Sequence, residues 1–124
     1  MSDDISKLPP QVQERLLRMQ QLQQTLQSVL SQKQQVEMEL AEIGQASSEV
    51  EKLTEDAVIY KSAGSLMIRA HKTNISSELG ERKELLNTRV TILTKQEERL
   101  RGQLKDLQSK LQQDLNPVSP PSEP

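Results

Sequence analysis

Few residues of this chain could perform chemistry, and their types and spacing argue against catalysis. His71 is the single histidine and the chain has no cysteine, so the usual ligands of a metal site are lacking. The segment Ser62-Ala63-Gly64-Ser65 has one glycine and no lysine at phosphate-loop spacing, which gives nucleotide binding no support. No nucleophile is paired with a base and an orienting residue. The sequence therefore predicts a protein that is not an enzyme, with no metal site and no cofactor.

Two other ionisable residues, Lys33 and Glu97, interrupt the apolar positions of heptad repeats. Polar residues at such positions usually set the register and partner choice of a coiled coil. We interpret both as structural; a functional role for their charges is the alternative. His71 is interpreted as a solvated loop residue.

The composition indicates long helices rather than a compact globular core. The 124 residues include one tyrosine, no phenylalanine and no tryptophan, and 27% of them are charged. The net charge of −2 includes no basic block, so neither nucleic acid nor an anionic membrane is an expected partner. The first residues are acidic without an apolar signal segment, and no apolar run approaches the roughly 20 residues that span a bilayer. We expect a cytoplasmic protein.

Two predicted helices carry heptad repeats. After a mobile N-terminus (1–9), the first should span 10–53, with Pro10 in its first turn. The second should span 73–115, capped by Thr73 or Asn74 and followed by a disordered Pro-rich tail (116–124). The a and d positions, here called the seam, are Val12, Arg15, Met19, Leu22, Leu26, Val29, Lys33, Val36, Leu40, Ile43, Ser47 and Val50, and then Leu79, Lys83, Leu86, Val90, Leu93, Glu97, Leu100, Leu104, Leu107 and Leu111.

The segment 57–70 between the helices predicts a β-hairpin, because β-branched residues and the only aromatic flank a glycine-containing turn. We expect a four-residue turn, Ser62–Ser65. One face should carry Val58, Tyr60, Leu66 and Ile68, and the other Ile59 and Met67.

The predicted fold is mainly α: an antiparallel two-helix coiled coil joined by one β-hairpin. Pairing seam residues whose numbers add to 126 places Leu22 opposite Leu104 and Arg15 opposite Leu111, with residue 63 as the centre. A lone hairpin is marginal and leaves strand edges unpaired. We therefore expect hairpins of several subunits to assemble into a β-barrel platform. The oligomerisation residues would be Val58, Ile59, Tyr60, Gly64, Leu66, Met67 and Ile68.

Five segments give the chain a resemblance to the β subunit of the archaeal prefoldin family. They are Pro9-Pro10-Gln11-Val12-Gln13, Gln20-Gln21-Leu22-Gln23-Gln24, Gln32-Lys33-Gln34-Gln35-Val36-Glu37, Asp56-Ala57-Val58-Ile59-Tyr60-Lys61-Ser62 (followed by Gly64 and Leu66) and Gln96-Glu97-Glu98-Arg99-Leu100. The hairpin segment is the most specific of these, and a single hairpin matches the β type.

The resemblance implies an ATP-independent chaperone, a hexamer of two prefoldin α and four β subunits. Its hairpins would build a double β-barrel, and its coiled coils would capture unfolded proteins at their open ends and transfer them to a group II chaperonin. In this chain the expected client-binding residues are Val12, Leu16, Leu17, Met19, Leu22, Leu104, Leu107, Leu111 and Leu115. The alternatives are that the off-seam leucines merely broaden the seam, and that the protein is a passive scaffold or tether assembled through its hairpins.

Overall fold

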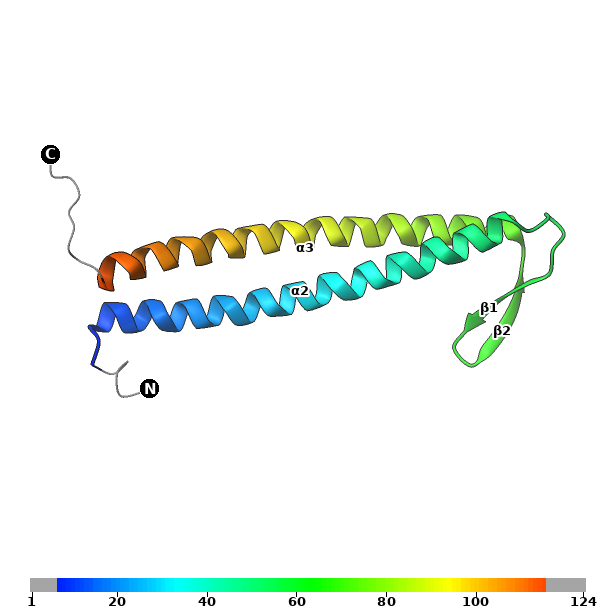
Figure 1. Ribbon diagram of the computed structural model, residues 1–124. Coiled ribbons are helices and arrows are strands. Elements are labelled where there is room, and N and C mark those ends of the chain that lie inside the picture. Colours follow the sequence, from blue (N-terminus) through cyan, green and yellow to red (C-terminus); the bar gives the residue numbers. More distant parts are fainter. Residues whose placement is uncertain (1–6, 116–124) are drawn as a thin grey trace, which may run out of the picture. The chain divides into compact units, whose positions relative to one another are not determined.

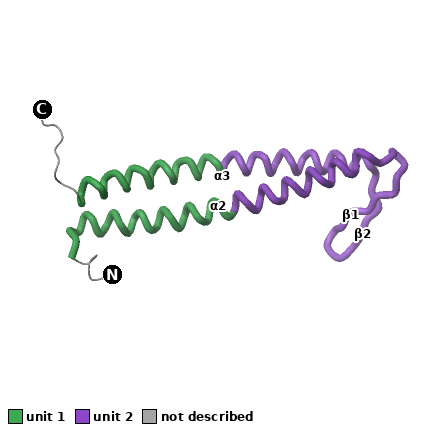
Figure 2. The backbone as a smooth tube through the Cα atoms, in the orientation of Figure 1, with its two compact units in different colours: residues 1–31, 94–124 green, residues 32–93 purple. Residues whose placement is uncertain are grey.

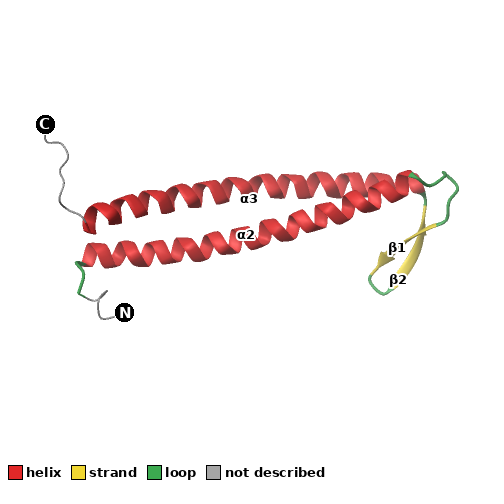
Figure 3. Cartoon of the chain, in the orientation of Figure 1, coloured by secondary structure: helices red, strands yellow, loops and turns green. Residues whose placement is uncertain are grey.

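The computed structural model describes residues 7–115 and contains two long helices joined by a two-stranded hairpin (Figure 1). In chain order the elements are α2 (Pro10–Glu51), β1 (Ile59–Ala63), β2 (Leu66–Ala70) and α3 (Lys72–Leu115) (Figure 3). The predicted disordered tail and most of the predicted mobile N-terminus lie outside the described residues.

Helix α2 begins at Pro10, as the sequence predicts, but ends two residues before position 53. At its start the Pro9 carbonyl accepts from the backbone N–H groups of Val12 and Gln13, both at 3.0 Å. At its end the N–H groups of Lys52 and Leu53 donate to carbonyls only three residues back, at 3.3 and 3.1 Å. The final turn is thus tightened into 3₁₀-type bonding, which satisfies backbone groups that an α-helical end leaves free.

The hairpin turn has two residues, not the four that the sequence suggested. Ala63 pairs with Leu66, so Gly64 and Ser65 alone form the loop. Gly64 has a φ of +64°, and among the described residues no residue other than glycine has a positive φ. A positive φ at the first loop position only is typical of a type II′ turn, whose twist suits a hairpin.

This register also changes the predicted faces of the hairpin. Tyr60 pairs with Arg69, and Lys61 pairs with Ile68. Because directly opposite residues of antiparallel strands lie on one face, Ile68 and Leu66 share a face with Ile59 rather than with Tyr60. The predicted faces correspond to a register centred on residue 63, and they were wrong because the observed register is shifted from that one by an odd number of positions. The pairing is centred between residues 64 and 65, not at 63.

Helix α3 begins at Lys72, and its N-cap is His71 rather than Thr73 or Asn74. The His71 carbonyl accepts from the N–H of Ile75 at 3.0 Å, while the Thr73 hydroxyl lies 3.5 Å from a carboxylate oxygen of Glu55. Thr73 is therefore already inside the first turn, where its side chain bonds the segment before the hairpin.

The described chain divides into two compact units (Figure 2). We call residues 7–31 and 94–115 the end unit, and residues 32–93 the hairpin unit. The buried residues of the end unit are Val12, Leu22, Val29, Leu100, Leu104 and Leu111. Those of the hairpin unit are Val36, Ile43, Ile75, Leu86 and Leu93. All of these except Ile75 occupy predicted seam positions, so the heptad pattern identifies the apolar stripe that the helices bury.

Candidate functional site

The contacts of His71 and Glu97, two of the ionisable residues singled out in the sequence, fit structural roles. His71 is exposed at the N-cap of α3, and the described residues contain no group of three side chains that could hold a metal ion. Glu97 accepts from Nε of Arg101 at 2.9 Å, one turn along the same helix. Such i,i+4 pairs support a helix surface and need no catalytic explanation.

The nine predicted client-binding residues differ widely in burial. All of them lie in the end unit. Leu17 and Leu115 are exposed, each with an exposed fraction of 58%, and Leu16, Met19 and Leu107 are half-buried. The remaining four are buried: Val12, Leu22, Leu104 and Leu111. The end unit thus exposes Leu17 and Leu115 to solvent, in addition to the seam leucines that its two helices bury between them.

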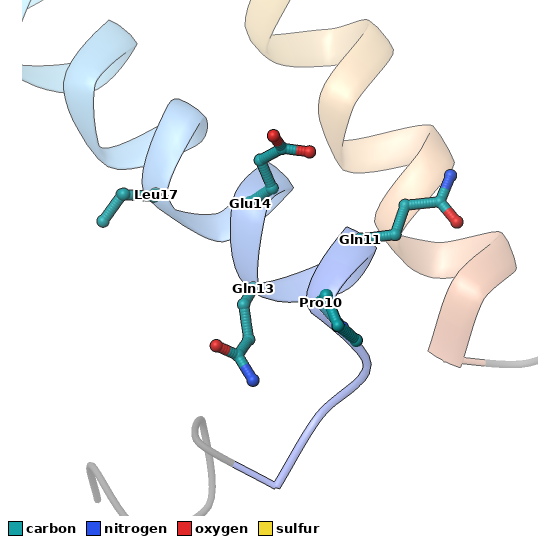
Figure 4. A pocket seen from close by; sticks show the side chains of 5 residues that line it. All are labelled: Pro10, Gln11, Gln13, Glu14 and Leu17. Atoms are coloured by element: carbon teal, nitrogen blue, oxygen red, sulfur yellow. The ribbon is translucent and has the colours of Figure 1, made fainter.

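Two shallow hollows lie along the first turns of α2. One, of about 570 Å³, is lined by Pro10, Gln11, Gln13, Glu14 and Leu17 (Figure 4). The other is lined by Gln13, Leu16, Leu17 and Gln20. In Figure 4 the Leu17 side chain points away from α3, whereas Gln11 points toward it. The amide of Gln13 donates to the Leu8 carbonyl at 2.7 Å. A leucine surrounded by glutamine amides can make apolar contacts and hydrogen bonds to an extended chain without demanding one sequence.

A third hollow lies between the two helices of the end unit, and the sequence reasoning missed its rim. The seam leucines Leu22 and Leu107 contribute to its lining. The polar members are Arg18, Gln103, Asp106 and Lys110. Arg18, Gln103 and Lys110 occupy g positions beside the seam, which a heptad assignment would have identified, whereas Asp106 occupies a c position.

The sequence reasoning also missed an ion pair between the helices. Arg15, a seam residue that the sequence places opposite Leu111, pairs through Nη1 with Oδ2 of Asp114. The side chains are 24% and 21% exposed. Continuing the three-four seam spacing past Leu111 leads directly to Asp114, so a sequence signal for this residue existed.

The predicted oligomerisation residues of the hairpin are mostly exposed. The exposed fractions are 58% for Val58, 56% for Tyr60, 64% for Leu66, 65% for Met67 and 43% for Ile68, while Ile59 is half-buried. Val58 precedes β1 rather than lying within it. Because the described sheet has two strands, each strand keeps one edge without a backbone partner.

One face of the hairpin is turned toward the helices of the hairpin unit. A hollow of about 590 Å³ is lined by strand residues Ile59 to Ala63 together with Ala46, Val50, Ile75, Glu78, Leu79 and Arg82. Nζ of Lys61 donates to Glu78 at 2.8 Å and ties β1 to α3. Nζ of Lys72 donates to the Leu53 carbonyl at 2.8 Å, close to the end of α2. These contacts fix the base of the hairpin and leave its other face open.

None of the helices in the described part of the chain is both long enough and apolar enough to pass through a membrane.

Known proteins share both the sequence and the fold. The chain matches the prefoldin subunit family over residues 13–117. It is 42% identical to the prefoldin subunit beta of Methanothrix thermoacetophila over 114 residues, which cover 92% of this chain and 95% of that protein. It is 44% identical to the prefoldin subunit beta of Saccharolobus islandicus over 114 residues, 92% of this chain and 90% of that protein.

Solved structures give the same result. The crystal structure of the prefoldin beta subunit from Thermococcus strain KS-1 superposes with a TM-score of 0.84 at 41% identity, covering 89% of this chain and 96% of that one. The beta2 subunit of the same strain shares the fold, with a TM-score of 0.67 at 20% identity, covering 73% of this chain and 97% of that one. The chain therefore belongs to the prefoldin family of chaperone subunits, and its similarity is to the β type.

Proposed function

We propose that this protein is a holdase subunit that captures unfolded polypeptides at the end unit without ATP and passes them to a group II chaperonin. It would act in the cytoplasm within a hexamer of two prefoldin α and four β subunits, whose hairpins form a β-barrel platform. The family supplies the expectation of a chaperone assembled from subunits. The proposal places the capture of clients in the end unit and assembly in the hairpin.

The observation that carries the proposal is the exposed leucine of the end unit. Leu17 and Leu115 are each 58% exposed, and Leu17 borders two hollows whose linings each include two glutamines. Apolar side chains with several accessible rotamers on an open surface suit weak contacts with many sequences. Three half-buried residues would enlarge the surface that contacts a client: Leu16, Met19 and Leu107. Four buried residues would hold that surface in place by packing between the helices: Val12, Leu22, Leu104 and Leu111.

Assembly through the hairpin is supported by its exposed residues and its unpaired edges. Tyr60 and Met67 lie on one face and are 56% and 65% exposed. An isolated two-stranded hairpin with this much exposed apolar surface is marginal in water. Strands from neighbouring subunits would cover the surface and pair with the edges.

The proposal is tested by light scattering. A chemically unfolded protein is diluted into buffer without ATP, in the presence of this chain, its α partner, the assembled complex, or neither. We expect the assembled complex to suppress aggregation in proportion to its concentration. A complex of confirmed hexameric size that left the aggregation of several clients unchanged would contradict the proposal and favour the passive scaffold.

A further inference from the structure

The ion pair between Arg15 and Asp114 links the two helices close to their free ends. Arg15 is in the second turn of α2, and Asp114 is the last residue but one of α3. Both side chains are about three quarters buried, at 24% and 21% exposure. In the ion pairs Glu39–Arg82 and Lys61–Glu78 of the hairpin unit, by contrast, one partner is more than half exposed. The Arg15–Asp114 pair is therefore less screened by solvent than those surface pairs.

The residues beside this ion pair are the most completely buried of the described end unit. Val12 lies three positions before Arg15 on α2, and Leu111 lies three positions before Asp114 on α3, so each shares a helix face with its charged neighbour. Their exposed fractions are 4% and 5%, the lowest in the described end unit. The last turns of a helix normally open most easily. The Arg15–Asp114 pair joins the two helices at the level of this buried layer, where such opening would begin.

Breaking the contact would change the surface that the end unit presents. Val12 is the first buried residue of α2, and Leu111 is the last buried residue of α3, so together they form the outermost buried layer of the described end unit. Separation of the ends would expose Val12 and Leu111 next to the already exposed Leu17 and Leu115.

We infer that Arg15 and Asp114 form a clasp that regulates how much apolar surface the end unit offers to a client. With the clasp closed, the contact surface is limited to the exposed and half-buried leucines. With the clasp open, the buried terminal layer joins that surface. This inference rests on the proposed function of the end unit.

Charge reversal in the assembled complex tests the clasp. The variants are Arg15→Asp, Asp114→Arg and the double variant R15D/D114R, which restores opposite charges. The matched control is Arg101→Asp, because Arg101 pairs within α3 and its side chain is 56% exposed. Hydrogen exchange is measured for amides of residues 11–22 and 104–115.

Each single variant should speed exchange in these segments by about tenfold, the equivalent of ~1.4 kcal/mol. The double variant should return to within about twofold of the unchanged protein, and the control should stay there. Unchanged exchange in the single variants, or a double variant that exchanges as fast as they do, would overturn the clasp.

The same variants are compared in the aggregation assay. The single variants should reach half-suppression at a complex concentration at least about twofold lower than the unchanged protein does, and the double variant should not. Faster exchange without any gain in suppression would overturn the regulatory role. Failure of the unchanged complex to suppress aggregation would instead contradict the proposed function, and the exchange result would still decide whether the clasp exists.

Discussion

Replacing Leu17 and Leu115 with serine should weaken client holding and leave assembly intact. Both side chains are 58% exposed, so a client can cover them without disturbing the buried seam. Full burial of a leucine side chain is worth about 1.5 to 3 kcal/mol. If a client covers about half of the exposed part, the two leucines together contribute roughly 1 to 2 kcal/mol, which corresponds to about a 5- to 25-fold change in affinity.

The matched control is the double variant Leu85→Ser and Ile92→Ser. These residues are 62% and 51% exposed on α3 of the hairpin unit, so the chemical change and the loss of helix propensity are similar. The assay is the complex concentration that halves the light scattering of an unfolded client. Equal losses in the control and in the end-unit variant would refute the reasoning, because exposed leucine would then act regardless of position. An unchanged end-unit variant would refute it as well.

Three further substitutions test the structure. Gly64→Ala should destabilise the hairpin by about 1 to 2 kcal/mol, because a φ of +64° strains alanine even though no atom crowds the site. A lower hexamer yield in size-exclusion chromatography would show this effect, and an unchanged yield would contradict it. Lys72→Met removes the bond to the Leu53 carbonyl, and we expect the melting temperature measured by circular dichroism to fall by about 2 to 5 °C. Leu93→Ala should cost about 2 to 4 kcal/mol in chemical unfolding, against less than about 1 kcal/mol for Leu85→Ala; equal costs would contradict the burial of Leu93.

The helices could be predicted because their signals are local and repeated. Pro10 fixes the start of α2, and seam residues such as Leu22, Leu93 and Leu100 identify the buried stripe over many turns. A single misplaced residue hardly disturbs such a pattern. The hairpin allowed no such averaging: centring its pairing on residue 63 instead of between Gly64 and Ser65 moved Leu66 and Ile68 to the wrong face.

The end unit could be located from the sequence but not resolved in detail. An excess of leucine near the free helix ends is visible in the sequence, but treating Leu16 and Leu17 alike as off-seam residues hides that they occupy the e and f positions of the heptads. The structure distinguishes them, with Leu16 half-buried and Leu17 exposed, because an e position flanks the seam and an f position lies on the outer face of the helix. The pairing of Arg15 with Asp114 was missed because the predicted seam ended at Leu111, one step before Asp114.

Client capture by the end unit is tested most directly by site-specific photo-crosslinking. A photoreactive amino acid is placed at Leu17 in one version of the assembled complex and at Leu85 in another, and each is illuminated with a freshly diluted unfolded protein. Both positions are exposed, one in each unit. We predict client adducts from Leu17 and few from Leu85. Adducts of equal yield from both positions, or from Leu85 alone, would contradict capture at the end unit.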